Sequence, residues 1–191
     1  MDSPAPKRTI VIDIDGTILS RSFLDSLRLY LGKTDRVGHA FAVMPQIITE
    51  LSSQYRIVAL TARAERGRRN TLSWLSRHGL PFVEVVHSPQ FQLMESSRKA
   101  FKTAAIAHLL DSGYEIAYGV GDRMSDFESY VANKIFPLVV LRPHQRGRKS
   151  KILALAAKLG LAESQYAVFE ETVESPAWPA IQKFIAEHNK A

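Results

Sequence analysis

Short apolar segments alternate with amphipathic ones along most of the chain, and this alternation restricts the fold more than any other feature. The first segment, TIVIDI at residues 9–14, is rich in β-branched residues and ends at the turn-forming DGT, which is typical of a strand buried on both faces. The pattern predicts strands at residues 9–14, 56–60, 82–86, 115–120 and 137–141. It predicts helices at residues 22–31, from Pro45 onward, at 65–78, 97–111 and 125–133, and from about residue 150 to the end with a break near 174–179. Because such alternation requires crossover connections, we predict an α/β fold with a doubly wound, mainly parallel, five-stranded sheet covered by helices on both faces.

Length and composition indicate a single folded unit. The chain has 191 residues, of which 46% are hydrophobic and 23% charged, and this composition excludes a disordered or collagen-like chain. We expect a flexible tail at residues 1–8 and a core at 9–145. Residues 146–191 are expected to form a helical extension that packs on the core or lies at an oligomer interface.

The absence of cysteine excludes several kinds of chemistry. The sequence contains none, which rules out disulfides, thiolate zinc sites and cysteine nucleophiles. Its apolar runs are far shorter than the ~20 residues that span a bilayer, and the start lacks the pattern of a secretory signal. We therefore expect a cytoplasmic protein without a transmembrane segment.

Polar clusters follow three of the predicted strands. Asp13 and Asp15 follow the first strand, Thr61 and Arg63 the second, and Asp122 and Asp126 the fourth. In a parallel sheet the carboxyl ends of the strands lie at one edge, where ligands of such sheets bind. A helix that carries Lys99 and Lys102 precedes the fourth strand. The sequence therefore predicts that carboxylates, a hydroxyl, an arginine and a lysine meet at this edge.

Such a cluster of carboxylates needs positive charge, because neighbouring carboxylates repel each other. Mg²⁺ is the natural partner, since it prefers hard oxygen ligands and the chain offers no cysteine and no paired histidines. A carboxylate nucleophile beside a metal ion and a lysine points to phosphate chemistry, in which an aspartyl-phosphate can form.

These motifs resemble those of the haloacid dehalogenase (HAD) superfamily of phosphohydrolases. DIDGT at residues 13–17 is similar to the first motif of that family, Thr61 to the second, Lys102 or Lys99 to the third, and GDRMSD at 121–126 to the fourth. The likeness covers roughly residues 9–141 and implies a Rossmann-like catalytic core. Its implied activity is magnesium-dependent hydrolysis of a phosphate monoester.

The resemblance also implies a role for each matching residue. Asp13 is the expected nucleophile and Asp15 the expected general acid and base, with Thr61 and Lys102 completing the catalytic set. Gly16, Thr17 and Arg63 are expected to bind substrate; Arg63, two residues after Thr61, can fork onto a phosphate. The expected metal ligands are Asp13, Asp15 through its carbonyl, Asp122, and Asp126 directly or through water.

Several alternatives stay open at this stage. Lys99 can replace Lys102 as the third motif, and Asp126 can simply be an acid at a helix N-terminus. Weaker likenesses point to the catalytic domains of lipin-type phosphatidate phosphatases, which usually carry Asn in place of Asp122, and to polynucleotide phosphatase domains. A catalytically silent binding or scaffold domain of the same fold is the main rival function, although intact Asp13, Asp15, Thr61 and Asp122 argue against it. A phosphotransferase or phosphonatase is the rival within the fold.

Two features bear on the substrate. The gaps between Thr17 and Thr61 and between Thr61 and Lys102 are about 40 residues each, too short for a separate cap domain, so we expect an open site for a bulky or accessible substrate. Net charge is +6, and two basic clusters follow predicted strands. They are expected either to contact an anionic lipid or nucleic acid or to be solvated surface. Homo-oligomerisation is a further open expectation. The clusters are Arg63, Arg66, Arg68 and Arg69, and Arg142, Arg146, Arg148, Lys149 and Lys151.

Overall fold

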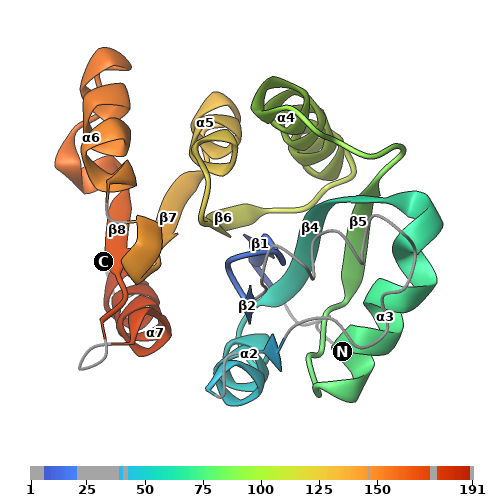
Figure 1. The fold of residues 1–191 in the computed structure, drawn as a ribbon. Coiled ribbons are helices and arrows are strands. Elements are labelled where there is room, and N and C mark those ends of the chain that lie inside the picture. Colours follow the sequence, from blue (N-terminus) through green and yellow to red (C-terminus); the bar gives the residue numbers. More distant parts are fainter. Residues whose placement is uncertain (1–6, 21–38, 41–42, 146, 173–175, 190–191) are drawn as a thin grey trace.

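The main sheet confirms the predicted α/β architecture. The structure is a computed structural model that describes residues 7–20, 39–40, 43–145, 147–172 and 176–189. Within these residues the sheet has six strands in the order β5-β4-β1-β6-β7-β8, all parallel (Figure 1). Its strands are β1 (Thr9–Ile12), β4 (Arg56–Ala64), β5 (Glu84–Ser88), β6 (Ile116–Gly121), β7 (Phe136–Leu141) and β8 (Ala167–Glu170). The chain winds outward from central β1 in both directions, so β1, β4 and β6 lie side by side.

The prediction of five strands is wrong by one, because β8 adds a sixth. This segment reads AVFE and pairs only with β7, so it is a short edge strand. Its residues are half-buried and lack the long apolar run of an inner strand. Residues 146–191 are therefore not entirely helical: β8 lies between α6 (Arg148–Lys158), η3 (Glu163–Gln165) and α7 (Ala177–His188).

Helices cover both faces of the sheet, as predicted. One face carries α2 (Met44–Ser52), α3 (Arg68–Arg77) and α7; the other carries α4 (Glu95–Asp111), α5 (Met124–Ala132) and α6 (Figure 1). Successive side chains of a strand point to opposite faces. Accordingly, Ile10 and Ile12 of β1 pack in the cluster with α2, α3 and α7, whereas Val11 packs with α4.

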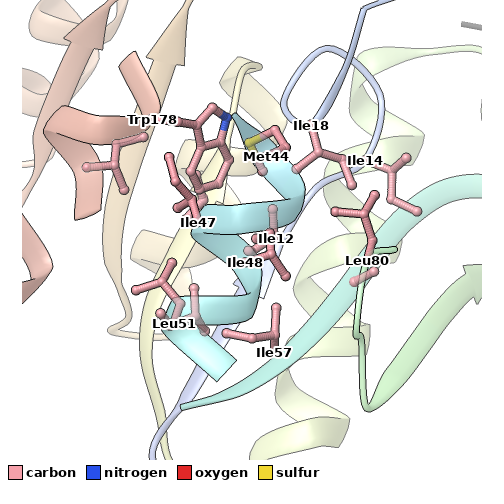
Figure 2. Close-up of a cluster of buried hydrophobic side chains, with 14 of the residues drawn as sticks. Ile12, Ile14, Ile18, Met44, Ile47, Ile48, Leu51, Ile57, Leu80 and Trp178 are labelled. Carbon is pink, nitrogen blue, oxygen red and sulfur yellow. The ribbon is translucent and has the colours of Figure 1, made fainter. Parts of the chain in front are cut away.

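Helix α2 illustrates how the core fixes the segment after β1. Pro45 stands in its first turn, where proline favours helix initiation. The helix buries Met44, Ile47, Ile48 and Leu51, spaced to form one apolar face. Figure 2 shows these side chains against residues of β1, β4, α7 and the loops after β1 and α3. Those partners include Ile12, Ile14, Ile18, Ile57, Leu80 and Trp178.

Other differences from the expected elements are local. Helix α4 begins at Glu95, and Ser97 does not cap it: its hydroxyl donates to the carbonyl of Met94 (2.9 Å) inside the first turn. Residues 65–67 form the 3₁₀ turn η1 before α3, and β2 (Leu19–Ser20) pairs antiparallel with β3 (His39–Ala40), a pairing not predicted. The helix predicted at 22–31 and most of the tail predicted at 1–8 lie outside the described residues. In the described part of the chain, no helix combines the length and the apolar character needed to cross a bilayer.

Candidate active site

The residues of the four motifs meet at the carboxyl edge of the sheet. Asp13 follows β1, Thr61 and Arg63 lie in the last part of β4, and Asp122 follows β6. Because β4, β1 and β6 are neighbours in the sheet, the fold brings these positions together. Helix α4 adds Lys102.

The ammonium group of Lys102 links two carboxylates. Its Nζ donates to Oδ1 of Asp13 (2.7 Å) and also to Oδ1 of Asp126, and all three side chains are buried. Burial opposes the charge on Lys102, but the carboxylates of Asp126 and Asp13 outweigh burial and raise its pKa. Lys99 lies elsewhere and pairs with Glu128 (2.7 Å). The geometry therefore favours Lys102 for the third motif.

Asp13, Asp122 and Asp126 form a compact acidic triad. One carboxylate oxygen from each lies within 4.8 Å of the others. Burial raises the pKa of Asp13 to about 6, although Lys102 opposes the shift, and burial also raises the pKa values of Asp122 and Asp126. Three carboxyl groups thus surround one ammonium group, and burial disfavours the charged form of each of them.

Asp126 has the arrangement of an acid at a helix N-terminus, and it also binds Lys102. Its Oδ2 accepts a hydrogen bond from the backbone N–H of Arg123 (2.9 Å) at the start of α5, as an acid at a helix N-terminus does. Its Oδ1 accepts from Lys102. One carboxylate therefore anchors the fourth motif to both α5 and α4.

Asp122 has the arrangement expected of a metal ligand. Its Oδ2 accepts from Nε2 of Gln145 (2.6 Å), but its buried Oδ1 has no hydrogen-bond partner among the described residues. Buried polar atoms are nearly always satisfied, so an orphaned oxygen requires a reason. A divalent cation that prefers oxygen ligands supplies one, and the triad offers the carboxylates that Mg²⁺ binds. The donor set therefore fits Mg²⁺.

Asp15 points to a different partner from Asp13. Nη2 of Arg63 donates to its Oδ1 (2.7 Å), and Nε donates to its Oδ2 (3.0 Å). Nη1 of Arg63 donates to Oγ1 of Thr71 (3.2 Å), and the Arg63 backbone N–H donates to Oγ1 of Thr61 (3.2 Å). Arg63 is thus brought to the site, but its guanidinium binds Asp15.

The Gly16–Thr17 turn lies directly against the triad. Gly16 has φ +94°, and a Cβ there would come within 2.5 Å of Oδ2 of Asp122. The buried hydroxyl of Thr17 is 3.5 Å from Oδ2 of Asp13. Both residues therefore lie against the acidic triad, and their expected role in binding substrate stays a prediction.

Two residues from the far end of the chain hold this turn from behind. Arg142 donates to the carbonyls of Gly16 (3.1 Å) and Thr17 (2.6 Å), and it pairs with Glu171. Trp178 of α7 donates from Nε1 to the carbonyl of Thr17 (3.0 Å). Burial lowers the pKa of Arg142 to about 10. We call these two side chains the C-terminal clamp.

The second basic cluster is only partly a free cationic surface. Arg142 is buried in the clamp, Arg148 donates to the carbonyl of Asp122 (3.1 Å), and Lys149 pairs with Glu170 (2.8 Å). Lys151 is exposed, and Arg146 lies outside the described residues. In the first cluster, Arg66, Arg68 and Arg69 are exposed beside the end of β4.

Sequence reasoning missed three residues at the site. Arg142 was expected only as a member of a basic cluster, and neither Trp178 nor Gln145 was expected at the site. Arg142 directly follows β7, so the strand-end rule that identified Asp13 and Asp122 also marks its position. Trp178 is buried, and no sequence signal links its indole N–H to a turn so distant along the chain.

Several solved structures have the same fold as this chain. D,D-heptose 1,7-bisphosphate phosphatase from B. bronchiseptica, solved with magnesium and phosphate, matches with 16% identity and a TM-score of 0.62, over 95% of this chain and 99% of that one. An L-2-haloacid dehalogenase matches with 12% identity and a TM-score of 0.59, over 94% and 99%. A chain of the Pnkp1/Rnl/Hen1 RNA repair complex matches with 14% identity and a TM-score of 0.56, over 68% of this chain but only 40% of that one. These neighbours share the fold of this chain, and its motifs stand in the order expected from the resemblance to the HAD superfamily.

A family model narrows this class. The model described as "PITM 1-3, LNS2 domain" matches residues 10–140, and the chain belongs to this LNS2 family. No curated protein matches the sequence. The chain was expected to be a HAD-type phosphoric monoester hydrolase, and one solved neighbour with this fold is a bisphosphate phosphatase.

Proposed function

We propose that the protein is a magnesium-dependent phosphatase that hydrolyses a phosphate monoester through an aspartyl-phosphate on Asp13. The observation that carries this proposal is the buried Lys102, which links Asp13 to Asp126 beside Asp122. A structural core would gain little from so many buried charges, because desolvation of charged groups is costly. A site that handles a phosphate group needs them.

In the proposed first step, a carboxylate oxygen of Asp13 forms a bond to phosphorus while the bond to the leaving oxygen breaks. Asp15 gives its proton to the leaving oxygen. Lys102, already bonded to Asp13, offsets negative charge on the transferring phosphoryl group. Thr61, whose buried hydroxyl lies at the end of β4, holds a phosphate oxygen.

In the proposed second step, water attacks phosphorus, Asp15 takes a proton from that water, and inorganic phosphate leaves. Asp122, Asp126, Asp13 and the carbonyl of Asp15 would hold Mg²⁺. When bound, Mg²⁺ supplies positive charge that offsets the charge on the phosphate oxygens. The raised pKa of Asp13, about 6, still leaves the nucleophile mostly ionised at neutral pH.

The substrate is proposed to be bulky or accessible. Between Thr61 and Lys102 the structure contains only the rest of β4, η1, α3, β5 and part of α4, so this stretch holds no separate domain. Contact with an anionic lipid or nucleic acid through Arg66, Arg68, Arg69 and Lys151 stays a prediction. The cytoplasmic location and homo-oligomerisation stay predictions as well.

The test is hydrolysis of p-nitrophenyl phosphate by the purified protein. Activity should require Mg²⁺, disappear after exhaustive treatment with EDTA, and return when Mg²⁺ is added. Asp13→Asn should abolish turnover while the variant remains folded by circular dichroism. Full activity after chelation would refute the metal-dependent mechanism. Binding of phosphate and Mg²⁺ without any turnover would instead indicate the silent binding domain.

A further inference from the structure

Arg63 and Asp15 form a forked and largely buried ion pair. Nη2 and Nε of Arg63 reach the two oxygens of Asp15 at 2.7 and 3.0 Å, and the side chains are only 11% and 13% exposed. A forked pair of this kind fixes both distance and plane, because guanidinium and carboxylate match each other in shape. The carboxylate of Asp15 is therefore held in one orientation.

Arg63 is itself held from a second side. Its Nη1 donates to Oγ1 of Thr71 in α3 (3.2 Å), and that hydroxyl also lies 3.3 Å from the carbonyl of Gly67, to which it donates. Thr71 is buried. Each of the three guanidinium nitrogens of Arg63 thus already has an acceptor. These bonds leave one N–H on each Nη for any further acceptor, such as a substrate phosphate.

The proposed role of Asp15 as a general acid explains why the orientation of its carboxyl group matters. A general acid has to lie within about 2.6–3.2 Å of the oxygen that it protonates, and a small misplacement of a reacting group is costly. Asp15 stands in the turn after β1, and the fork from Arg63 limits the rotamers that its carboxylate can adopt. Lysine cannot replace the fork, since an ammonium group is a point charge on a flexible stem.

We propose that Arg63 is a positioning residue: it fixes the carboxylate of Asp15 for proton transfer, and it does not hold the substrate phosphate. The inference rests on the proposed phosphatase function and assigns Arg63 a role other than the substrate contact expected from the sequence. In the first step the ester bond from phosphorus to the leaving oxygen breaks, and Asp15 supplies the proton that this oxygen needs. The importance of Arg63 should therefore depend on the leaving group.

Two substrates separate the roles. An alkyl phosphate releases a strongly basic alkoxide and needs the proton, whereas p-nitrophenyl phosphate releases a stable phenolate and hardly needs it. We compare kcat/KM, because this ratio reports the first half-reaction and leaves out hydrolysis of the aspartyl-phosphate. Arg63→Lys should lower kcat/KM for n-propyl phosphate by about 10- to 100-fold, part of the effect of a general acid. For p-nitrophenyl phosphate the loss should be less than about threefold, and inhibition by inorganic phosphate should not change.

Thr71→Val provides a second, milder variant in case Arg63→Lys does not fold. It removes the anchor of Nη1 alone, so it should show the same dependence on the leaving group with a smaller loss of about two- to tenfold. Arg77→Lys is the matched control, since Arg77 is exposed on α3, the helix that carries Thr71, and it should change kcat/KM for neither substrate. Thermal unfolding of all three variants verifies that they are folded.

The outcomes are distinct. Equal losses on both substrates together with weaker inhibition by inorganic phosphate would show that Arg63 binds the phosphate, and the inference would be wrong. Unchanged kinetics with both substrates in a folded Arg63→Lys variant would also overturn it. A wild-type protein that hydrolyses neither substrate with Mg²⁺ present would refute the proposed function, and the positioning role with it.

Discussion

Replacing Gly16 with alanine tests how closely the turn after β1 is fitted to the acidic triad. The backbone there has φ +94°, and a Cβ would come within 2.5 Å of Oδ2 of Asp122. A left-handed conformation costs an L-residue roughly 1–2 kcal/mol. A forced contact in a packed interior adds typically about 1–3 kcal/mol. Gly16→Ala should therefore lower the free energy of unfolding by about 2–5 kcal/mol.

Gly113 supplies a matched control, because it has φ +86° with no atom within 4 Å of the position of its missing Cβ. Gly113→Ala should cost only the conformational part, roughly 1–2 kcal/mol. For a chain of this size each kcal/mol corresponds to about 2–4 °C in Tm. Thermal unfolding of both variants, with wild type beside them, separates the steric contact from the backbone conformation.

Gly16→Ala and Gly113→Ala should differ more in their effect on activity than in their effect on stability. The added methyl group would displace the carboxylate of Asp122, whereas Gly113 lies in the turn after α4, remote from the motifs. Disturbed support of a metal ligand commonly costs about 10- to 100-fold in metal affinity. Gly16→Ala should raise the Mg²⁺ concentration for half-maximal hydrolysis of p-nitrophenyl phosphate by at least about tenfold, and Gly113→Ala should not. Equal Tm values and equal Mg²⁺ requirements in the two variants would refute the reasoning.

Three further predictions follow from the buried charges and the clamp. The folded-state pKa of Asp13, about 6, lies above its usual 3.8, so the folded protein binds more protons than the unfolded protein. The free energy of unfolding of the metal-free wild type should therefore rise by about 1–3 kcal/mol as the pH falls from 7.5 to 4.5. Urea unfolding in EDTA should show this gain reduced in Asp13→Asn, and an unchanged pH dependence would contradict it. Lys102→Met removes the ion-pair partner of two buried carboxylates and should lower the free energy of unfolding by about 3–5 kcal/mol without metal. Lys99→Met, which breaks a partly exposed pair, should lower it by less than about 1 kcal/mol. Similar urea midpoints for the two variants would contradict this difference. Trp178→Phe removes one buried donor and should lower stability by about 1–2 kcal/mol and slow turnover, and Trp74→Phe in α3, equally buried, should leave turnover unchanged.

The sequence predicted the sheet because its inner strands carry strong signals. β1, β4 and β6 are buried on both faces and read as continuous apolar runs, so their number and parallel pairing follow from the pattern. β8 was missed because an edge strand with half-buried residues has no such run. The apolar pattern therefore missed the one strand of the main sheet, among the described residues, whose side chains are all only partly buried.

At the site, too, positions that depend on the neighbouring sequence were predicted, whereas contacts between distant residues were not. Asp13 and Asp122 were placed correctly because they directly follow buried strands, and parallel strands end at one edge. The choice between Lys102 and Lys99 could not be made, since residues three apart in a helix share nearly the same face. The partner of Arg63 was also out of reach: its fork onto Asp15 joins residues of two strand ends, and only the register of β1 against β4 brings them together.

The C-terminal clamp also bears on when this chain can become active during synthesis. The turn that carries Asp13 and Asp15 is synthesised before Arg142 and Trp178, which hold its carbonyls from a strand end and from a helix much further along the chain. The family match ends at residue 140, before either of them. A nascent chain that has emerged only to that point could pair β1, β4 and β6 but would leave the turn without these two donors. Activity should therefore arise late in synthesis, once α7 has left the ribosome and Trp178 can donate to the carbonyl of Thr17.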